Sequence, residues 1–322
     1  MRAVYAETIN PENPLAGLVV GERPEPEVPD GWARVRVQAA ALNHHDLFSL
    51  RGVGLGEERL PMILGCDAAG LDEEGREVLV HSVIPSPGFT GDETTDPRRS
   101  LLSEKHQGTF ADTVVVPKGN VVPKPQSLSM VEAACLPTAW LTAYRMLFVR
   151  GAMRPGETVL VQGVGGGVAT ALITLASAAG LRVIATSRSE EKLGRARELG
   201  AHLAVPSGER LPEKVDAVME SVGQATWSHS IRSLRPGGRL VVCGHTSGPK
   251  PDDAQLTRIF FLQLSVIGST MGTKGELGDL VRFLESTGTR PLVDRTLPLE
   301  SAREGFAAME SGDQVGKIVF TL

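Results

Sequence analysis

The sequence predicts an α/β protein of two domains, one rich in β-strands and the other a doubly wound parallel sheet. Its 322 residues exceed what a single hydrophobic core usually serves. Short alternating segments between Pro and Gly clusters fill the first third, which is typical of a small barrel. Strand and helix patterns then alternate through the middle of the chain. We therefore place the first domain at residues 1–126 and 290–322, and the second at residues 127–289.

The first domain is interrupted by a polar segment, residues 82–108, which we interpret as a lobe or long loop. Near the end of the chain, Ser301–Met309 has a helix pattern and Val315–Thr321 a strand pattern. We expect this terminal strand to return to the first domain and to lie at an edge of its barrel. The strands expected in the first third are Trp32–Val37, Glu77–Val80, Thr113–Val116 and Val121–Val122.

The second domain begins with a helix signal. Ser127 or Ser129 is a suitable N-cap, and Glu132 follows Ser129 at capping-box spacing. The helix pattern continues to residue 149 and is broken by Pro137. Strands are then expected at Thr158–Gln162, Arg182–Thr186, Ala201–Val205, Val215–Glu220 and Arg239–Cys243, with helices at Ala169–Ala179, 189–200 and Trp227–Leu234.

A glycine-rich turn separates the first of these strands from its helix, at Gly163, Gly165, Gly166 and Gly167. Glycine allows the backbone to turn tightly and to approach a pyrophosphate, which the helix N-terminus then binds. The third glycine of the dinucleotide-binding fingerprint is replaced by Val168. The turn predicts a Rossmann-type nucleotide site; a glycine turn without a ligand, or one for another nucleotide such as S-adenosylmethionine, remains an alternative.

The end of the next strand discriminates between the two nicotinamide cofactors. Proteins that prefer NAD usually carry Asp or Glu there, bonded to the ribose 2′-hydroxyl. Here Ser187 stands at that place, followed by Arg188 and, a turn later, by Lys192. Hydroxyl, guanidinium and ammonium groups bind a 2′-phosphate through charge-assisted hydrogen bonds. We therefore predict NADPH as cofactor; ordinary surface charge at the start of a helix is the alternative.

Composition excludes several classes of partner. The chain is 41% apolar and 22% charged, as in folded globular proteins, and its net charge of −5 gives no electrostatic case for nucleic acid or a membrane surface. Cys66, Cys135 and Cys243 are few and widely spaced, and the N-terminus lacks the apolar run of a secretory signal. We expect a cytoplasmic protein. Residues 158–181 are uncharged and long enough to span a bilayer, but the glycine turn favours a strand, a turn and a helix.

The whole chain resembles the medium-chain dehydrogenase/reductase superfamily, which includes alcohol dehydrogenases and quinone oxidoreductases. The resemblance covers nearly all residues and rests on an ordered set of motifs: ALNHHDL, PMILGCDAAG, GTFADTVVVP, EAACLPTAWLTAY, the glycine turn, SRSEEKLGRARELGA, LRPGGRLVVCG, GSTMGT and GKIV. It implies a GroES-like catalytic domain followed by a Rossmann domain.

The resemblance also bears on zinc. At positions where zinc-dependent members carry Cys, a His–Glu pair and a second Cys, this chain has Asn43, Cys66 with Asp67, and Thr138. A catalytic zinc needs roughly three well-placed protein ligands. The four close cysteines of a structural zinc site are missing from residues 82–108. We therefore predict that no metal is bound.

The expected absence of zinc restricts the class of hydride acceptor that we predict. Hydride transfer builds negative charge on the acceptor, and without a Lewis acid the acceptor itself must delocalise that charge or be met by hydrogen-bond donors. Quinones and α,β-unsaturated carbonyls do so. We predict an NADPH-dependent oxidoreductase for such substrates. The alternatives are a zinc-type alcohol or aldehyde dehydrogenase with altered ligands, and a non-catalytic NADPH-binding sensor.

By resemblance, the catalytic residues cluster at positions 43–46. Asn43 would donate its amide to the substrate oxygen, His44 would contact the cofactor pyrophosphate, and His45 would begin a proton relay. Asp46 would orient a neighbouring group, and Thr138 would line the pocket. The alternative is that these residues cap the following helix and never touch substrate.

The remaining assignments concern the far end of the second domain. The resemblance places Gly244, Ser269 and Thr270 at the cofactor. It also makes Leu264–Ser269 a candidate strand for pairing between two copies of the chain, so that we expect a homodimer. Cys66 is expected to be a buried, unreactive thiol, since the sequence shows no partner that would activate it.

Overall fold

The computed structural model describes all 322 residues and divides into two compact units. The first unit contains Met1–Ala139 and Gly272–Leu322, and the second contains Trp140–Met271. The first is thus built from two separate stretches of chain, as expected. Its boundaries differ from the expected ones, because residues 127–139 and 272–289 belong to it. The residues around position 130 belong to the first unit because helix α2 (Met130–Ala133) packs against its strands β3 and β5.

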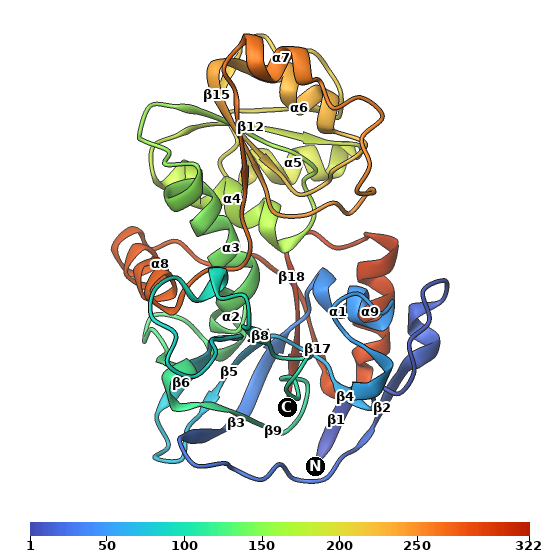
Figure 1. Ribbon diagram of the computed structural model, residues 1–322. Coiled ribbons are helices and arrows are strands. Elements are labelled where there is room, and N and C mark those ends of the chain that lie inside the picture. The colour runs from blue at the N-terminus through green and yellow to red at the C-terminus, as the bar shows by residue number, and fades with distance from the viewer. The chain divides into compact units, whose positions relative to one another are not determined.

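The first unit is a strand-rich domain of the predicted GroES-like kind (Figure 1). Its main sheet has the order β10-β6-β5-β3-β18-β17, with β9 also paired to β3, and a smaller sheet has the order β2-β1-β4. The strands are β1 Arg2–Ala6, β2 Leu18–Glu22, β3 Trp32–Ala41, β4 Met62–Ile63, β5 Asp67–Leu71, β6 Glu77–Val80, β7 Val83–Ile84, β8 Ser100–Leu101, β9 Thr113–Pro117, β10 Val121–Pro123, β17 Val293–Pro298 and β18 Lys317–Thr321; the helices are α1 His44–Leu50, α2, α8 Lys274–Thr287 and α9 Ala302–Ser311.

The terminal strand β18 returns to the first unit, but it is not an edge strand. It pairs antiparallel with β3 on one side and parallel with β17 on the other. Our expectation of an edge position was therefore wrong. The apolar run explains why: Ile318, Val319 and Phe320 are all fully buried, which suits a strand covered on both faces and flanked on both sides. The ring of Phe320 meets that of Phe110 edge-on, 5.2 Å between centroids, inside the core.

The second unit is a parallel sheet with strand order β13-β12-β11-β14-β15-β16, which confirms the doubly wound prediction (Figure 1). Every neighbouring pair in it is parallel. The strands are β11 Thr158–Val161, β12 Arg182–Ser187, β13 Leu203–Pro206, β14 Val215–Glu220, β15 Leu234–Val242 and β16 Ser265–Gly268; the helices are α3 Leu141–Tyr144, α4 Gly167–Ala178, α5 Glu190–Glu198, α6 Trp227–Ser233 and α7 Leu256–Phe261.

The helical stretch from residue 130 contains two wide turns. Ser129 caps α2, and its hydroxyl and the Glu132 carboxylate form the predicted capping box. Pro137 lies in a π-helical turn, Leu136–Trp140, and a second one spans Arg145–Arg150. A wide turn accommodates a residue that has no N–H to donate. None of the helices is long and apolar enough to cross a membrane, and residues 158–181 fold as β11, the glycine turn and α4.

Candidate active site

Helix α1 begins at the end of β3, and its first turn carries the residues expected to be catalytic. Asn43 is the N-cap, and the Asp46 carboxylate accepts the N–H of Asn43 at 2.8 Å and that of Gly65 at 3.0 Å. Asp46 is fully buried, and this burial raises its pKa to about 6. The carboxylate therefore caps the helix and ties it to the segment that precedes Cys66. This geometry favours the capping role of Asp46 over a catalytic one.

A buried lysine organises the other polar groups at this end of the barrel. The ammonium group of Lys317 donates to Leu42 O at 2.7 Å, to Asn43 Oδ1 at 2.6 Å and to Asp67 Oδ2 at 3.1 Å. Its side chain is only 2% exposed. Sequence reasoning missed Lys317 because it stood in a terminal strand motif; the available signal was a lysine flanked by an apolar run.

The amide of Asn43 is fully used within the protein. Its nitrogen donates to Asp67 Oδ2 at 2.8 Å and to Ala41 O at 3.2 Å, while its oxygen accepts from Lys317. An amide nitrogen has two hydrogens, so neither is left for a substrate oxygen in this arrangement. Asn43 therefore acts here as a bridge between Asp67 and Lys317.

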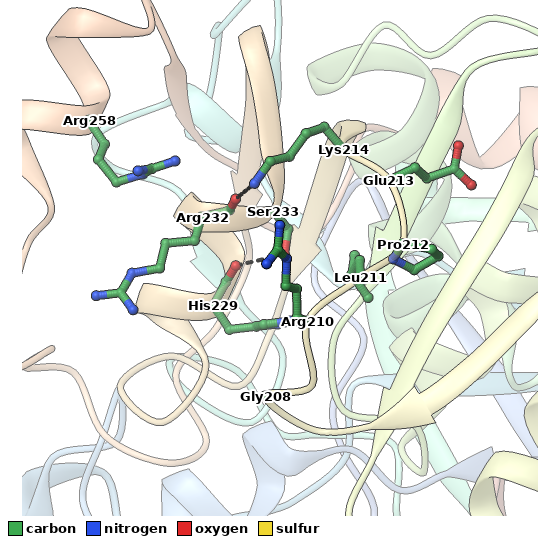
Figure 2. Close-up of a pocket in the computed structure, with 10 residues that line it drawn as sticks. All are labelled: Gly208, Arg210, Leu211, Pro212, Glu213, Lys214, His229, Arg232, Ser233 and Arg258. Carbon is green, nitrogen blue, oxygen red and sulfur yellow. Dashed lines mark hydrogen bonds between the residues drawn. The ribbon is translucent and has the colours of Figure 1, made fainter.

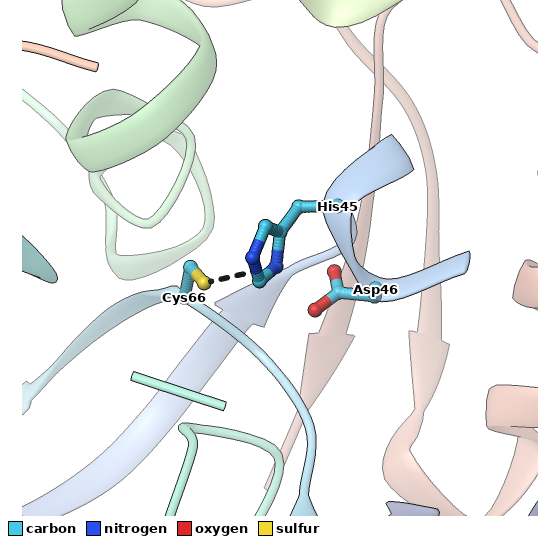
Figure 3. A group of neighbouring side chains, drawn as sticks. All are labelled: His45, Asp46 and Cys66. Carbon is cyan, nitrogen blue, oxygen red and sulfur yellow. Dashed lines mark hydrogen bonds between the residues drawn. The ribbon is translucent and has the colours of Figure 1, made fainter. Parts of the chain in front are cut away.

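The imidazole of His45 lies among three polar side chains. Its Nε2 is 3.0 Å from Glu104 Oε1, and its Nδ1 is 3.5 Å from both Cys66 Sγ and Ser103 Oγ. Figure 3 shows the ring directed from α1 toward the Cys66 sulfur. Burial opposes the positive charge, yet Cys66 and Glu104 outweigh it and raise the pKa of His45 well above 6.5. The part of this rise that is due to charge on Cys66 requires a thiolate, so with a protonated thiol the Glu104 hydrogen bond is what favours the imidazolium form.

Ser103 and Glu104 were not identified from the sequence. Both lie in the segment 82–108, where charged and polar residues are scattered without a motif. Burial raises the pKa of the Cys66 thiol, whose sulfur is 3.3 Å from Leu102 O, so the thiol remains protonated and donates to that carbonyl. The raised pKa disfavours a nucleophilic thiolate, although the structure gives Cys66 a partner, His45, that the sequence did not reveal.

Two further predicted residues of the first unit are His44 and Thr138. Burial lowers the pKa of His44, and the charges of Lys317 and Arg51 lower it further, so its ring is neutral at neutral pH. The hydroxyl of Thr138 is buried and has no hydrogen-bond partner. Buried hydroxyls rarely stay unpaired, which favours a ligand atom at this point. The pyrophosphate contact of His44 stays a prediction.

The glycine turn has the geometry that a pyrophosphate needs. Gly163 has a φ of +71°, and a Cβ there would lie 2.5 Å from the side chain of Val222. Gly165 also has positive φ, Gly166 is the N-cap of α4, and Gly167 is its first residue. The unpaired N–H groups at the start of this helix of 12 residues can therefore bind an anion. The turn fits a dinucleotide.

The other predicted cofactor residues lie along the carboxyl edge of the same sheet. Ser187 ends β12, and its oxygen accepts the N–H of Ser189, the N-cap of α5; Arg188 is exposed. No carboxylate ends this strand. The remaining residues are Val168 and Lys192 in the first turns of α4 and α5, Gly244 after β15, and Ser269 and Thr270 after β16. Carboxyl ends of parallel strands are where such sheets bind ligands, and the Ser269 hydroxyl is buried without a partner.

Three side chains around His45 carry donor atoms of the kind that hold metal ions. One ligand atom each from His45, Asp46 and Cys66 lie within 4.8 Å of one another (Figure 3). Asp46 accepts two backbone N–H groups, and the Cys66 thiol donates to a carbonyl. His45 meets Glu104 through Nε2 alone, and its Nδ1 faces the Cys66 sulfur at 3.5 Å. Zinc would require the thiolate and a free imidazole nitrogen. To hold zinc, Asp46 and Cys66 would therefore have to give up their present hydrogen bonds.

A GroES-like domain and a dinucleotide-binding sheet together define a nicotinamide-dependent oxidoreductase. Residues 29–126 match the family model of the alcohol dehydrogenase GroES-like domain, and residues 167–286 match that of the zinc-binding dehydrogenases. The chain belongs to the medium-chain dehydrogenase/reductase superfamily, which confirms the resemblance.

Relatives with different activities share this architecture. The acryloyl-coenzyme A reductase of Sulfurisphaera tokodaii is 28% identical, with 95% of this chain and 97% of that protein aligned. The zinc-type alcohol dehydrogenase-like protein YogA of Leptosphaeria maculans is 30% identical, with 89% and 90% aligned. A crystal structure of an NAD-dependent alcohol dehydrogenase superposes with a TM-score of 0.92 at 35% identity, covering 100% of both chains.

Proposed function

We propose that this oxidoreductase uses NADPH to reduce a conjugated carbonyl compound, a quinone or an α,β-unsaturated carbonyl, without a catalytic metal. The observation that carries the proposal is the bonding of Lys317 to Asn43 and Asp67. By resemblance, Asn43 and Asp67 stand at or beside zinc-ligand positions. A buried ammonium group bonded to both takes up the Asn43 oxygen and neutralises the Asp67 carboxylate, so a cation gains less from either residue.

The acceptor class follows from the missing Lewis acid. A simple carbonyl concentrates the developing charge on one oxygen, whereas a conjugated one spreads it over several atoms. One relative is named for acryloyl-coenzyme A, in which a C=C bond is conjugated with a thioester carbonyl. That name supports a conjugated acceptor for this chain as well.

The reaction balances with one hydride and one proton. When bound, the reduced nicotinamide supplies the hydride. His45 supplies the proton, since its imidazolium is maintained by Glu104. Both side chains are 22% exposed, so a proton can return to His45 from water by way of the carboxylate. The unpaired hydroxyl of Thr138 orients the substrate by a hydrogen bond. The product is the saturated carbonyl or the hydroquinone.

The preference for NADPH rests on the end of β12. Proteins that prefer NAD usually carry a carboxylate at this position, and it would repel a 2′-phosphate. This chain has Ser187 there, followed by the exposed Arg188. The similar crystal structure is of an NAD-dependent enzyme, so both cofactors belong in the test.

The test is an acceptor panel with each cofactor in turn. We expect oxidation of NADPH, faster than of NADH, with quinones and enones and little with unconjugated aldehydes. A zinc-type alcohol dehydrogenase would instead prefer simple aldehydes and alcohols, and would need zinc. Binding of NADPH without turnover of any acceptor would indicate a sensor.

We also propose that two copies pair through β16. This strand is the edge of the second unit's sheet, and Val266 on it is exposed. A strand edge that lacks a neighbouring strand and carries apolar side chains can pair with the same strand of a second copy. Leu256, Phe260 and Phe261 of the preceding helix α7 are also exposed.

A further inference from the structure

The second unit contains a cavity that the oxidoreductase function does not use. It has a volume of about 670 Å³ and lies between the segment 208–214, which links β13 to β14, and helices α6 and α7. Its lining includes none of the glycine turn and none of the residues at the end of β12. The volume is that of a small-molecule pocket.

The lining is strongly basic. Four cationic side chains, Arg210, Lys214, Arg232 and Arg258, surround the cavity (Figure 2). The chain as a whole carries a net charge of −5, so this concentration of positive charge is local. The pKa of Lys214 is lowered by burial and by the charges of Arg258 and Arg210, which shows that these cations repel one another.

Acidic side chains do not balance these charges. Glu213 is the one carboxylate in the lining, and it pairs with Arg182, 2.8 Å away, which is not a lining residue. Figure 2 shows its carboxylate directed away from the basic groups. The ammonium group of Lys214 donates to the backbone oxygen of Arg232, a neutral partner. The Nε atom of Arg258 is buried and has no hydrogen-bond partner.

The wall of the cavity is held in place by a hydrogen-bond chain. His229 accepts from Gln162 Nε2 at 2.8 Å through Nδ1 and donates to Glu209 O at 2.8 Å through Nε2. Gln162 Oε1 in turn accepts the hydroxyl of Thr186 at 2.6 Å. Because both nitrogens of His229 are hydrogen-bonded within the protein, its ring is fixed in orientation and offers no nitrogen to a ligand. The arginine and lysine side chains are therefore the groups that can bind one.

We propose that this cavity is a binding site for a small phosphorylated anion, separate from the dinucleotide site. Guanidinium groups bind phosphate oxygens in pairs, and several cations around one cavity suit a ligand with more than one negative charge. A concave site of this volume favours a small molecule over a nucleic acid, which would need an extended basic surface.

The test is calorimetric titration with inorganic pyrophosphate at physiological ionic strength. The full chain is first saturated with NADP⁺ in one series and with NAD⁺ in another, so that the glycine turn is occupied whichever cofactor binds. We expect saturable binding of pyrophosphate, weakened at least about tenfold by Arg232→Ala and by Arg210→Ala, since each removes a charged hydrogen bond. The matched control is Arg195→Ala on α5, whose side chain pairs with Glu198; it should leave the affinity unchanged.

Three results of the pyrophosphate titration, and one of an acetate control, would overturn the proposal. The three are no saturable binding, equal affinity in wild type and in both cavity variants, and displacement of pyrophosphate by the dinucleotide, which would place it on the glycine turn. Acetate at the same charge concentration checks for attraction without a phosphate preference, and an equal affinity for it would also contradict the site. None of these results depends on turnover, so the proposed reaction can fail while this site stands.

Discussion

The ammonium nitrogen of Lys317 lies 3.1 Å from Oδ2 of Asp67, and both side chains are almost wholly buried, at 2% and 0% exposure. The two residues are 250 positions apart in the chain, so the pair joins the terminal strand to the start of β5. A buried pair of this kind is costly to break, because the remaining charge keeps its desolvation penalty without a partner.

Replacement of Lys317 by methionine should therefore strongly destabilise the first unit. We expect Lys317→Met to lower the free energy of unfolding by about 3–5 kcal/mol, measured by urea denaturation. The double variant Lys317→Met with Asp67→Asn should recover part of that loss, because no buried charge remains. A single variant as stable as the wild type would show that the pair does not form.

The capping role of Asp46 gives a stability prediction with a defined pH dependence. Its pKa is about 6 in the folded protein against 3.8 for an unperturbed carboxyl. The folded state thus favours the protonated form, and this contribution is complete below 3.8 and lost as the pH rises through about 6. Relative to Asp46→Asn, the wild type should lose about 2 kcal/mol between pH 4 and pH 7. A constant difference between the two proteins would contradict the shift.

Substitution of His45 should affect turnover rather than cofactor binding. We expect His45→Ala to lower kcat by about 10²–10⁴-fold, which is the usual contribution of a positioned proton donor. The Kd for NADPH should stay unchanged, because His45 contacts no cofactor atom in the proposed reaction. An unaltered kcat would remove His45 from the mechanism.

Glu104 acts through His45, and its variant should alter the pH profile. Burial lowers the pKa of His45, while Cys66 and Glu104 raise it, and the net shift is upward. As a proton donor, His45 works below that raised pKa, so kcat should fall on the alkaline side. Glu104→Gln should move this fall to lower pH. The control is Glu58→Gln, an exposed carboxylate paired with Arg59; identical profiles for all three proteins would exclude Glu104 from this role.

Arg188 should discriminate between the cofactors. Its exposed side chain is available for a 2′-phosphate, and loss of one charged hydrogen bond costs about 1.5–3 kcal/mol. We expect Arg188→Ala to raise the Kd for NADPH at least about tenfold and to leave that for NADH unchanged. The matched control is Arg195→Ala, on the helix α5 that follows Arg188. Equal losses for both cofactors would refute the phosphate contact.

Sequence patterns predicted best those elements whose two ends are marked by residues close to them in the sequence. The expected strand at Val215–Glu220 matches β14, because a short apolar run stands between Pro212 and the polar residues after Glu220. Strand β15 was expected to begin at Arg239 but begins at Leu234, since Leu234 pairs with Val215 across a register shift. A bulge that absorbs Pro and Gly residues looks like a turn in the sequence.

The polar network around His45 was only half predictable. The motif ALNHHDL marked positions 43–46, and the structure does place them together at the start of α1. Their partners could not be found in the same way, because Glu104 is 59 positions away from His45 and Lys317 is 274 away from Asn43. Contacts at such separations depend on how β3, β18 and the segment 82–108 pack, which no local pattern encodes.

Turnover by zinc-free protein tests the proposed reaction most directly. The protein is treated with a chelator until metal analysis finds no zinc, and the oxidation of NADPH is then followed with an enone and a quinone, with and without added zinc. We predict full activity in the zinc-free sample and no gain when zinc is restored. Activity that disappears with the metal and returns with about one zinc per chain would contradict the proposal.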